Sequence, residues 1–456
     1  MSQLSLEQRI ALITSITEHG GELIGANELP EVLQSSEQLY TYDGFEPSGQ
    51  MHIAQGIIRA INVNKMIDAG FIFRMWVADW FAFLNNKLGG DLEKIQTVGK
   101  YFIEVWKASG MNVEKTEFLW TSDFVGQRWY WELVMKVAKA VTLKRALRTT
   151  AIMGRNESDD LSAGQILYPC MQAADIFGVM KARVTQLGLD QQKVNVLARE
   201  IGEELGYWKP VIVSHGMLQG LQKPVEKKMT LFQREDILNN AKVPFYTSEK
   251  KIGLDAEKLE TDVDTFQINF VNANNDILRT ITVSPQMTVE KYFDLEVDMP
   301  EPGTIRVTEN TQDRTISMKM SKSKPDTAIF MTDTDEEVQR KITKAYCPEG
   351  VAEDNPVLDY CKQIIFNAKY LKRETPLLEN DLFVISRKPE HGGDISFTSY
   401  AELEAAYVNK EVFPLDLKNA VVTYLNALLQ PVRDHFENDA EAKALLEQVR
   451  SFEVTR

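Results

Sequence analysis

Alternating strand and helix patterns run through the first half of this 456-residue chain and constrain its fold more than any other feature. Strands are predicted at 39–45, 71–78, 117–120, 184–187 and 211–214, with helices at 52–69, 92–109, 129–148 and 191–205. A strand–helix–strand order of this kind predicts an open, mostly parallel sheet that is covered by helices. Ligands of such sheets bind beyond the carboxyl ends of the strands.

Residues suited to phosphate binding follow the first strand. Residues 44–56 and Asp79 fall where strands end, and His52 stands at the start of a helix, where backbone N–H groups attract phosphate. Far along the chain, 319–323 (Lys-Met-Ser-Lys-Ser) is a loop with two ammonium groups, which can follow a moving phosphoryl group. Together the two segments predict a site that holds and polarises a nucleoside triphosphate.

The rest of the chain divides into three further parts. Ser5 and Gln8 can form a capping box at the start of a leading helix. Residues 223–317 are polar and turn-rich, with strand-like pieces at 266–271, 277–283 and 304–307, whereas helical periodicity prevails from Asp335 onward. The expected organisation is a helical extension at 1–38, an α/β domain at 39–354 with an inserted subdomain at 223–317, and a helical domain at 355–456.

Composition excludes several classes of protein. The formal net charge is -15, so any contact with nucleic acid must come from a local basic face. Three cysteines without CxxC spacing and five histidines without HExxH spacing predict neither a disulfide framework nor a metal site. No apolar run has membrane-spanning length and the N-terminus lacks a secretory pattern, so a cytoplasmic protein is expected.

The two phosphate-site segments are similar to the HIGH and KMSKS signatures of class I aminoacyl-tRNA synthetases. Residues 52–55 (His-Ile-Ala-Gln) depart from the first signature at Ala54 and Gln55, while 319–323 match the second in full. Within that class the chain resembles tyrosyl-tRNA synthetases of the archaeal and eukaryotic type. The stretches that carry this resemblance are 44–49, 167–175, 188–193, 344–348, 392–394 and 414–418.

The resemblance implies a fold and a reaction. The fold is a Rossmann-like, doubly wound parallel sheet forming the catalytic domain, with an inserted α+β segment and a helical anticodon-binding domain after it. The reaction activates L-tyrosine with ATP, which enters with Mg²⁺, and transfers the tyrosine to the 3′ end of tRNA(Tyr). A homodimer in the cytoplasm without membrane contact is implied, and 102–106 with 118–124 could supply its apolar surface.

Five residues are implied in tyrosine binding. Tyr168, Gln172 and Asp175 stand at i, i+4 and i+7, on one face of a helix, a pattern that a partly buried polar face would also show. The resemblance assigns Tyr168, Gln172 and Gln191 to the α-amino group and Tyr42 with Asp175 to the phenol. Because a polar pocket of this kind rejects phenylalanine by itself, as this family is known to do, 223–317 is not expected to be an editing domain.

Other residues are implied in ATP binding and catalysis. Catalysis is assigned to His52, Gln55, Lys319 and Lys322, because donors at a helix start and mobile lysines can neutralise the leaving pyrophosphate. Asp190 is assigned to the ribose hydroxyls. The full set expected to contact ATP is Gly44, His52, Gly56, Asp190, Lys319, Met320, Ser321 and Lys322. No protein-bound metal is expected.

Contacts with tRNA are expected in two places. A basic cluster on the helix at 129–148 is assigned to the acceptor stem, although charge runs usually mark a solvated face. An aromatic residue can stack on an unpaired base and a carboxylate can accept from guanine, although Phe413 could equally pack in a core. The residues are Lys144, Arg145 and Arg148 for the acceptor stem, and His391, Phe413 and Asp416 for the anticodon.

Three alternatives compete with this interpretation. Tryptophanyl-tRNA synthetases share the fold and both signatures, but would not need Tyr42 with Asp175. A small nucleotidyltransferase shares the first signature, but not the full 319–323 loop or the helical domain. A non-catalytic RNA-binding relative should have lost charge at His52, Lys319 or Lys322, and all three are retained.

Overall fold

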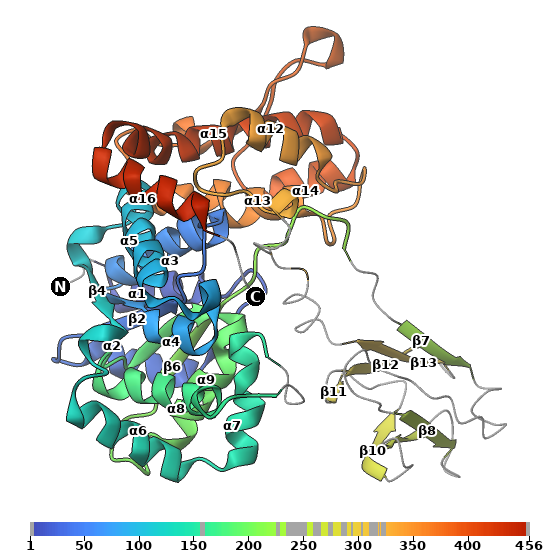
Figure 1. Ribbon diagram of the computed structural model, residues 1–456. Helices are drawn as coiled ribbons and strands as arrows, with labels where there is room; N and C mark the ends of the chain where they lie inside the picture. The colour runs from blue at the N-terminus through green and yellow to red at the C-terminus, as the bar shows by residue number, and fades with distance from the viewer. Residues whose placement is uncertain are drawn as a thin grey trace. The chain divides into compact units, whose positions relative to one another are not determined.

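The computed structural model describes residues 4–155, 160–224 and 325–452, together with Met318, Met320 and the strands between 229 and 309. The chain forms two compact units, one of residues 1–223 with 319–456 and one of residues 224–318 (Figure 1). The inserted segment is thus a unit of its own. The finer division into domains at 1–38, 39–354 and 355–456 stays a prediction.

A six-stranded sheet forms the centre of the first unit and confirms the predicted fold class. Its strand order is β1-β6-β5-β2-β3-β4, and every pairing is parallel except that of β1 with β6. The strands are β1 (Glu22–Ile24), β2 (Tyr40–Phe45), β3 (Ile72–Val77), β4 (Thr116–Trp120), β5 (Val184–Gly188) and β6 (Val211–His215). The chain moves outward from β2 in one direction and from β5 in the other, so a ligand crevice is expected where these two neighbours end.

Helices cover both faces of this sheet (Figure 1). One apolar core joins the sheet to α1, α2, α3 and α5, and a second joins the other face to α6, α8 and α9. The helices are α1 (Leu6–Thr14), α2 (Leu29–Gln34), α3 (Arg59–Asp68), α4 (Asp79–Leu84), α5 (Leu92–Ala108), α6 (Arg128–Ala140), α7 (Leu143–Thr149), α8 (Ala163–Gly178) and α9 (Gln192–Ile201). The predicted capping box of Ser5 and Gln8 is present at α1.

Two local predictions were wrong. The single helix expected at 129–148 is interrupted between α6 and α7, because Thr142 adopts an extended backbone and caps α7 by accepting a hydrogen bond from the Arg145 N–H. Of the apolar strip expected to form a dimer surface, the part at 102–106 is core instead, since Phe102 and Trp106 are fully buried. The part at 118–124 is only partly buried and stays a prediction. An apolar sequence pattern indicates that a surface is buried, but it does not show whether the same chain or a second subunit covers it.

The C-terminal part is helical, as predicted, and packs on the sheet unit. Its elements are α12 (Asp335–Lys344), α13 (Pro356–Gln363), α14 (Tyr400–Val408), α15 (Pro414–Asn438), α16 (Ala440–Ser451) and a hairpin of β14 (Phe383–Ile385) with β15 (Ile395–Phe397). The rings of Phe436 on α15 and Tyr101 on α5 lie 5.4 Å apart. Beside them His435 Nε2 lies 2.9 Å from a carboxylate oxygen of Glu104. The carboxyl-terminal helices are thereby fixed to the helix layer above the sheet.

The second unit contains two antiparallel sheets, with strand orders β10-β9-β8 and β11-β12-β13-β7. The strands are β7 (Met229–Gln233), β8 (Gly253–Lys258), β9 (Phe266–Val271), β10 (Ile277–Val283), β11 (Glu290–Tyr292), β12 (Leu295–Glu301) and β13 (Thr304–Glu309). Three of them coincide with the strand-like pieces predicted from the sequence. An α+β segment was expected, and within the described residues of this unit only strands are found.

Candidate active site

A cavity of about 320 Å³ lies at the carboxyl ends of β2 and β5, where the strand order reverses. Its wall contains seven of the residues assigned to substrates: Tyr42, Gly44, Gln55, Tyr168, Gln172, Asp190 and Gln191. A larger hollow of about 1020 Å³ lies at the amino ends of the strands, beside Gln38 and Ile72. The smaller cavity is the better candidate because ligands of parallel sheets bind at the carboxyl edge. Asp79 does not line it, since its carboxylate is engaged by Gln96 and Ser122.

Tyr42 lines this cavity, whereas Asp175 does not line it but lies close enough to act on Tyr42 by its charge, and both residues are fully buried. The Tyr42 hydroxyl lies 3.5 Å from Oδ1 of Asn195. The donors beside the Asp175 carboxyl are the Tyr130 hydroxyl and the Trp76 indole N–H, and neither forms a well-aligned hydrogen bond to it. Burial raises the pKa of Asp175 well above its usual range, and the neighbouring side chains of Tyr130 and Trp76 offset only part of that shift. A buried carboxyl with poorly aligned donors is costly, and a bound phenol could supply a better one.

The side chains assigned to the α-amino group lie together in the cavity. The amide of Gln172 lies 3.5 Å from Oε1 of Gln191, whose own amide donates to the Ile152 carbonyl at 2.9 Å. Tyr168 donates its hydroxyl proton to Oε1 of Glu46 at 2.8 Å. The hydroxyl oxygen of Tyr168 therefore keeps its lone pairs available to an ammonium group.

Glu46 is a site residue that the sequence did not single out. Its carboxylate accepts hydrogen bonds from Asn85 Nδ2 at 3.0 Å and from Tyr168, and Lys87 Nζ lies 3.6 Å from it. It lines the cavity, so it adds negative charge to the subsite of the α-amino group. It stands within the quoted stretch 44–49, but a single acid after a strand has no pattern that reveals its partners.

The helix predicted to hold phosphates begins with a wide π-helical turn at Ala54–Ile58, which continues into α3. Turns of this kind occur often at functional sites. His52 precedes it, and its Nδ1 accepts the backbone N–H of Gln55 at 3.3 Å, which leaves the proton on Nε2. Gly56 does not line the cavity, and a Cβ there would overlap the sulfur of Met331. Its hydrogen side chain allows the helix to approach the segment that follows the lysine loop.

Lys319, Ser321 and Lys322 lie outside the described residues, so their predicted contacts with ATP stay predictions. Met320 is buried, and its sulfur lies 3.9 Å from the Tyr360 hydroxyl.

The segment after the lysine loop pairs with the start of the His52 helix. Ile53 N–H donates to the Ile329 carbonyl at 2.8 Å, and Met331 N–H donates to the Met51 carbonyl at 2.9 Å. Backbone hydrogen bonds therefore join the first signature segment to residues 329–331, which follow the lysine loop in the sequence.

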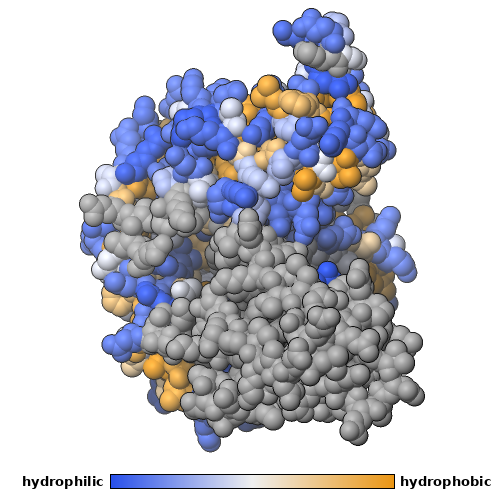
Figure 2. All heavy atoms as spheres, turned by 90° about the vertical axis from the view of Figure 1, so that its right-hand side faces the viewer, coloured by the Kyte–Doolittle hydropathy of each residue, from blue (hydrophilic) through white to orange (hydrophobic). Residues whose placement is uncertain are grey.

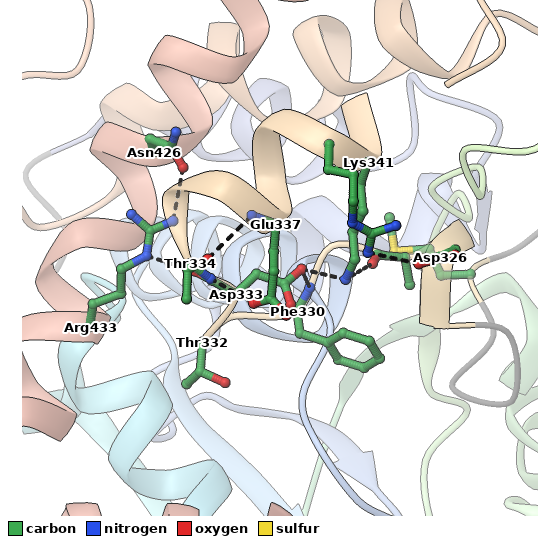
Figure 3. A network of polar contacts seen from close by, with 12 residues as sticks. Asp326, Phe330, Thr332, Asp333, Thr334, Glu337, Lys341, Asn426 and Arg433 are labelled. Atoms are coloured by element: carbon green, nitrogen blue, oxygen red, sulfur yellow. Dashed lines mark hydrogen bonds and ion pairs between the residues drawn. The ribbon is translucent and has the colours of Figure 1, made fainter. Parts of the chain in front are cut away.

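A polar network centred on Asp333 holds the segment 329–331 against the C-terminal helices (Figure 3). Asp333 Oδ2 accepts hydrogen bonds from the Phe330 N–H at 2.9 Å and from Lys341 Nζ at 2.6 Å. Arg433 on α15 donates to the Asp333 carbonyl at 2.7 Å. The Lys341 and Asp333 side chains are only 4% and 8% exposed, so this ion pair is buried. The backbone beside His52 is thus held by the C-terminal helices.

The residues assigned to the acceptor stem lie on α7. Lys144 and Arg148 are exposed, whereas Arg145 pairs with Glu200 at 2.7 Å. This pairing leaves two of the three cations as the basic surface of α7.

The residues assigned to the anticodon lie in two places of the C-terminal part: the short helix that ends at His391 and the start of α15. Phe413 caps α15 and is 57% exposed, which excludes the core-packing alternative for its ring. Asp416 follows it in the first turn, and His391 ends the short helix Pro389–His391. In the upper part of Figure 2, hydrophobic side chains interrupt a mainly hydrophilic surface. The exposed apolar residues of the C-terminal part are Val351, Val408, Phe413 and Leu415.

Comparison with known proteins identifies consistent relatives. The family model described as class I tRNA synthetases (W and Y) matches residues 34–231 and 298–430. A cytoplasmic tyrosine–tRNA ligase of Arabidopsis thaliana is 40% identical over 99% of this chain and 90% of its own length. The tyrosine–tRNA ligase of Thermococcus sibiricus is 32% identical over 99% of this chain and 100% of its own.

A solved structure is similar over the whole chain. The crystal structure of the tyrosyl-tRNA synthetase of Pyrococcus horikoshii, complexed with L-tyrosine, has a TM-score of 0.72 and 29% identity. It covers 98% of this chain and 100% of its own. The similarity therefore includes the sheet unit, the inserted segment and the C-terminal helices.

Proposed function

The chain belongs to the class I tRNA synthetases of the tryptophan and tyrosine group, and from this premise we propose that it is a tyrosine–tRNA ligase. It activates L-tyrosine with ATP to tyrosyl-adenylate and then transfers the tyrosine to the 3′ end of tRNA(Tyr). The observation that carries the choice of tyrosine is the buried pair of Tyr42 and Asp175, which offers a phenol a donor and an acceptor. An indole has only a donor and would leave part of this pair unsatisfied.

In the activation step, an oxygen of the tyrosine carboxylate attacks the α-phosphorus of ATP in line, and pyrophosphate leaves. Because no covalent bond to the enzyme forms, the protein contributes position and charge. Tyr168, Gln172 and Gln191, with Glu46 behind them, hold the α-ammonium group. His52 and Gln55 donate to the phosphates, and Lys319 and Lys322 neutralise the leaving pyrophosphate.

ATP binding precedes this step, and transfer to tRNA follows it. Asp190 accepts from the ribose hydroxyls of ATP, which binds as its Mg²⁺ complex. The terminal ribose hydroxyl of tRNA then attacks the carbonyl carbon of the adenylate, and AMP leaves.

The test is ATP–pyrophosphate exchange measured with each amino acid in turn. Exchange that depends on tyrosine and not on phenylalanine or tryptophan is expected. Exchange with tryptophan and none with tyrosine would overturn the proposal, while leaving the family membership intact. Exchange with neither would point to the loss of activation altogether.

Replacing Phe413 with alanine should lower aminoacylation of tRNA(Tyr) by about 5- to 100-fold, because stacking of a base on an aromatic ring contributes about 1–3 kcal/mol. The rate of tyrosine-dependent pyrophosphate exchange should stay the same, since that step needs no tRNA. Leu415→Ala is the matched control, because Leu415 is 52% exposed in the same helical turn and has no ring. Equal losses in both assays, or equal losses for both variants, would contradict an anticodon contact at Phe413.

We propose a homodimer whose contact lies on α6 and α7 rather than on the buried strip described above. Trp131 and Met135, one turn apart on α6, and Leu143 on α7 are exposed apolar side chains. Met135→Glu should shift the mass in solution, measured by light scattering, from dimer to monomer, because it would bury an unpaired charge in the contact. Val351→Glu, at an exposed site outside α6, should leave the dimer intact. A monomeric parent protein would exclude this contact.

We place the protein in the cytoplasm, as the name of the Arabidopsis thaliana relative indicates for that protein. Among the residues described, no helix has the length and apolar character needed to cross a membrane.

A further inference from the structure

Arg59 lies in the wall of the candidate active site, although no sequence pattern predicted a role for it. It is the first residue of α3, directly after the π-helical turn that contains Gln55. Its guanidinium grips Asp43 at the end of β2 through two hydrogen bonds, Nε to Oδ2 at 2.5 Å and Nη2 to Oδ1 at 3.1 Å. The side chains of Arg59 and Asp43 are 12% and 0% exposed.

One nitrogen of this guanidinium is left over. Nη1 of Arg59 is buried and has no acceptor among the residues that the structure describes. Leaving a buried donor unpaired costs free energy, especially on a charged group. Two apolar side chains of similar volume would stabilise the fold at least as well as a buried ion pair. The pair therefore calls for an explanation outside folding, and a ligand in the cavity would supply the acceptor that Nη1 lacks.

The position of Arg59 indicates which part of ATP it would contact. Phosphates are expected at the helix start, near His52 and Gln55, and Arg59 lies one turn further along the helix. Around it are Asp43, Asp190 after β5 and His215 at the end of β6. The Arg59 charge contributes to a lowered pKa of His215, after burial as the larger cause, and the Asp190 charge opposes it. Arg59 and the proposed ribose acceptor Asp190 thus line the same cavity, and the charges of both act on His215.

We propose that Arg59 is a nucleotide-binding residue that donates from Nη1 to an acceptor atom of the adenosine moiety of ATP, with Asp43 fixing its orientation. Asp43 balances the charge of the guanidinium, so the remaining N–H suits a neutral acceptor on the base or sugar better than a phosphate. This inference rests on the proposed function. Arg59 would thus add a nucleotide contact to the helix that begins at His52, where Ala54 and Gln55 depart from the usual signature.

The test compares Arg59→Lys with the double variant Asp43→Asn/Arg59→Gln in tyrosine-dependent pyrophosphate exchange. The double variant replaces the ion pair with a neutral pair that can still hydrogen-bond. It should therefore fold and allow the KM to be measured even if the lysine variant unfolds. Both should raise the KM for ATP by about 10- to 100-fold, the effect of one hydrogen bond to a charged group. The KM values for tyrosine and for pyrophosphate should stay the same.

Base and sugar analogues locate the acceptor. The parent enzyme should disfavour one analogue among 1-deaza-, 3-deaza- and 7-deaza-ATP and 2′-deoxy-ATP, and the variants should lose that preference. An unchanged KM for ATP in both variants, or a raised KM for pyrophosphate, would overturn the inference, the latter by indicating a phosphate contact. Because the parent enzyme is assayed first, absence of tyrosine-dependent exchange would instead refute the proposed function.

Discussion

Replacing Asp175 with alanine should lower the selectivity for tyrosine over phenylalanine by about 10²- to 10³-fold. A site that hydrogen-bonds a substrate hydroxyl can reject the analogue lacking it by about 10⁴- to 10⁵-fold, and here Tyr42 and Asp175 share that task. Asp175 is fully buried and its neighbours Tyr130 and Trp76 give it no well-aligned hydrogen bond, so phenylalanine would withhold the donor that tyrosine supplies. The ratio of kcat/KM for the two amino acids in pyrophosphate exchange measures the effect.

The same variant should be more stable than the parent protein above mildly acidic pH. Burial raises the pKa of Asp175 above its ordinary value of 3.8, so over the interval between the two values the folded state binds more protons than the unfolded state. The parent protein therefore loses stability as pH rises through that interval, and Asp175→Ala loses less, because only the contribution of Asp175 is removed. Urea unfolding of both proteins without ligand, at a series of pH values, gives the difference directly.

Asp175→Asn is the matched control for both measurements. It keeps an acceptor oxygen but removes the charge, so it should retain more selectivity than the alanine variant and show the same weakened pH dependence. Unchanged selectivity in Asp175→Ala would mean that the phenol does not bind at this end of the cavity.

The fold was predictable from the sequence because its signals are local. Strands β3 and β6 are short, mainly apolar runs, and the covering helices have apolar residues at helical spacing, so these patterns indicate the alternation. The break between α6 and α7 escaped because Thr142 lies inside a continuous amphipathic pattern, and only its extended backbone shows the cap. Strand β1, three residues long, carries too few residues for a pattern.

The candidate site was predictable only where its residues share one element or one motif. Tyr168 and Gln172 stand one turn apart on α8, so their common face follows from helical geometry. Glu46 and Arg59 depend on partners from other elements, and no spacing rule joins Glu46 to Tyr168 across 122 positions. Arg59 also follows a π-helical turn, which changes the side-chain phase that an ordinary helix would give.

Asp333→Ala should lower the free energy of unfolding by about 3–5 kcal/mol, because it leaves the ammonium group of Lys341 buried without its partner. The Phe330 N–H would lose its acceptor as well. Urea unfolding measures the loss. The double variant Asp333→Leu/Lys341→Met removes both charges and should recover most of it, since an apolar pair of similar size can replace a buried ion pair.

The rate of pyrophosphate exchange distinguishes an ion pair that only stabilises the fold from one that also positions His52. The segment 329–331 is tied to Met51 and Ile53, on either side of His52, so loosening it should displace the His52 imidazole from the phosphates. The apolar double variant lacks the Asp333 acceptor for the Phe330 N–H, so it should fold but show a lower kcat in pyrophosphate exchange with an unchanged KM for tyrosine. A double variant with the kcat of the parent enzyme would show that the ion pair holds the fold together without orienting His52.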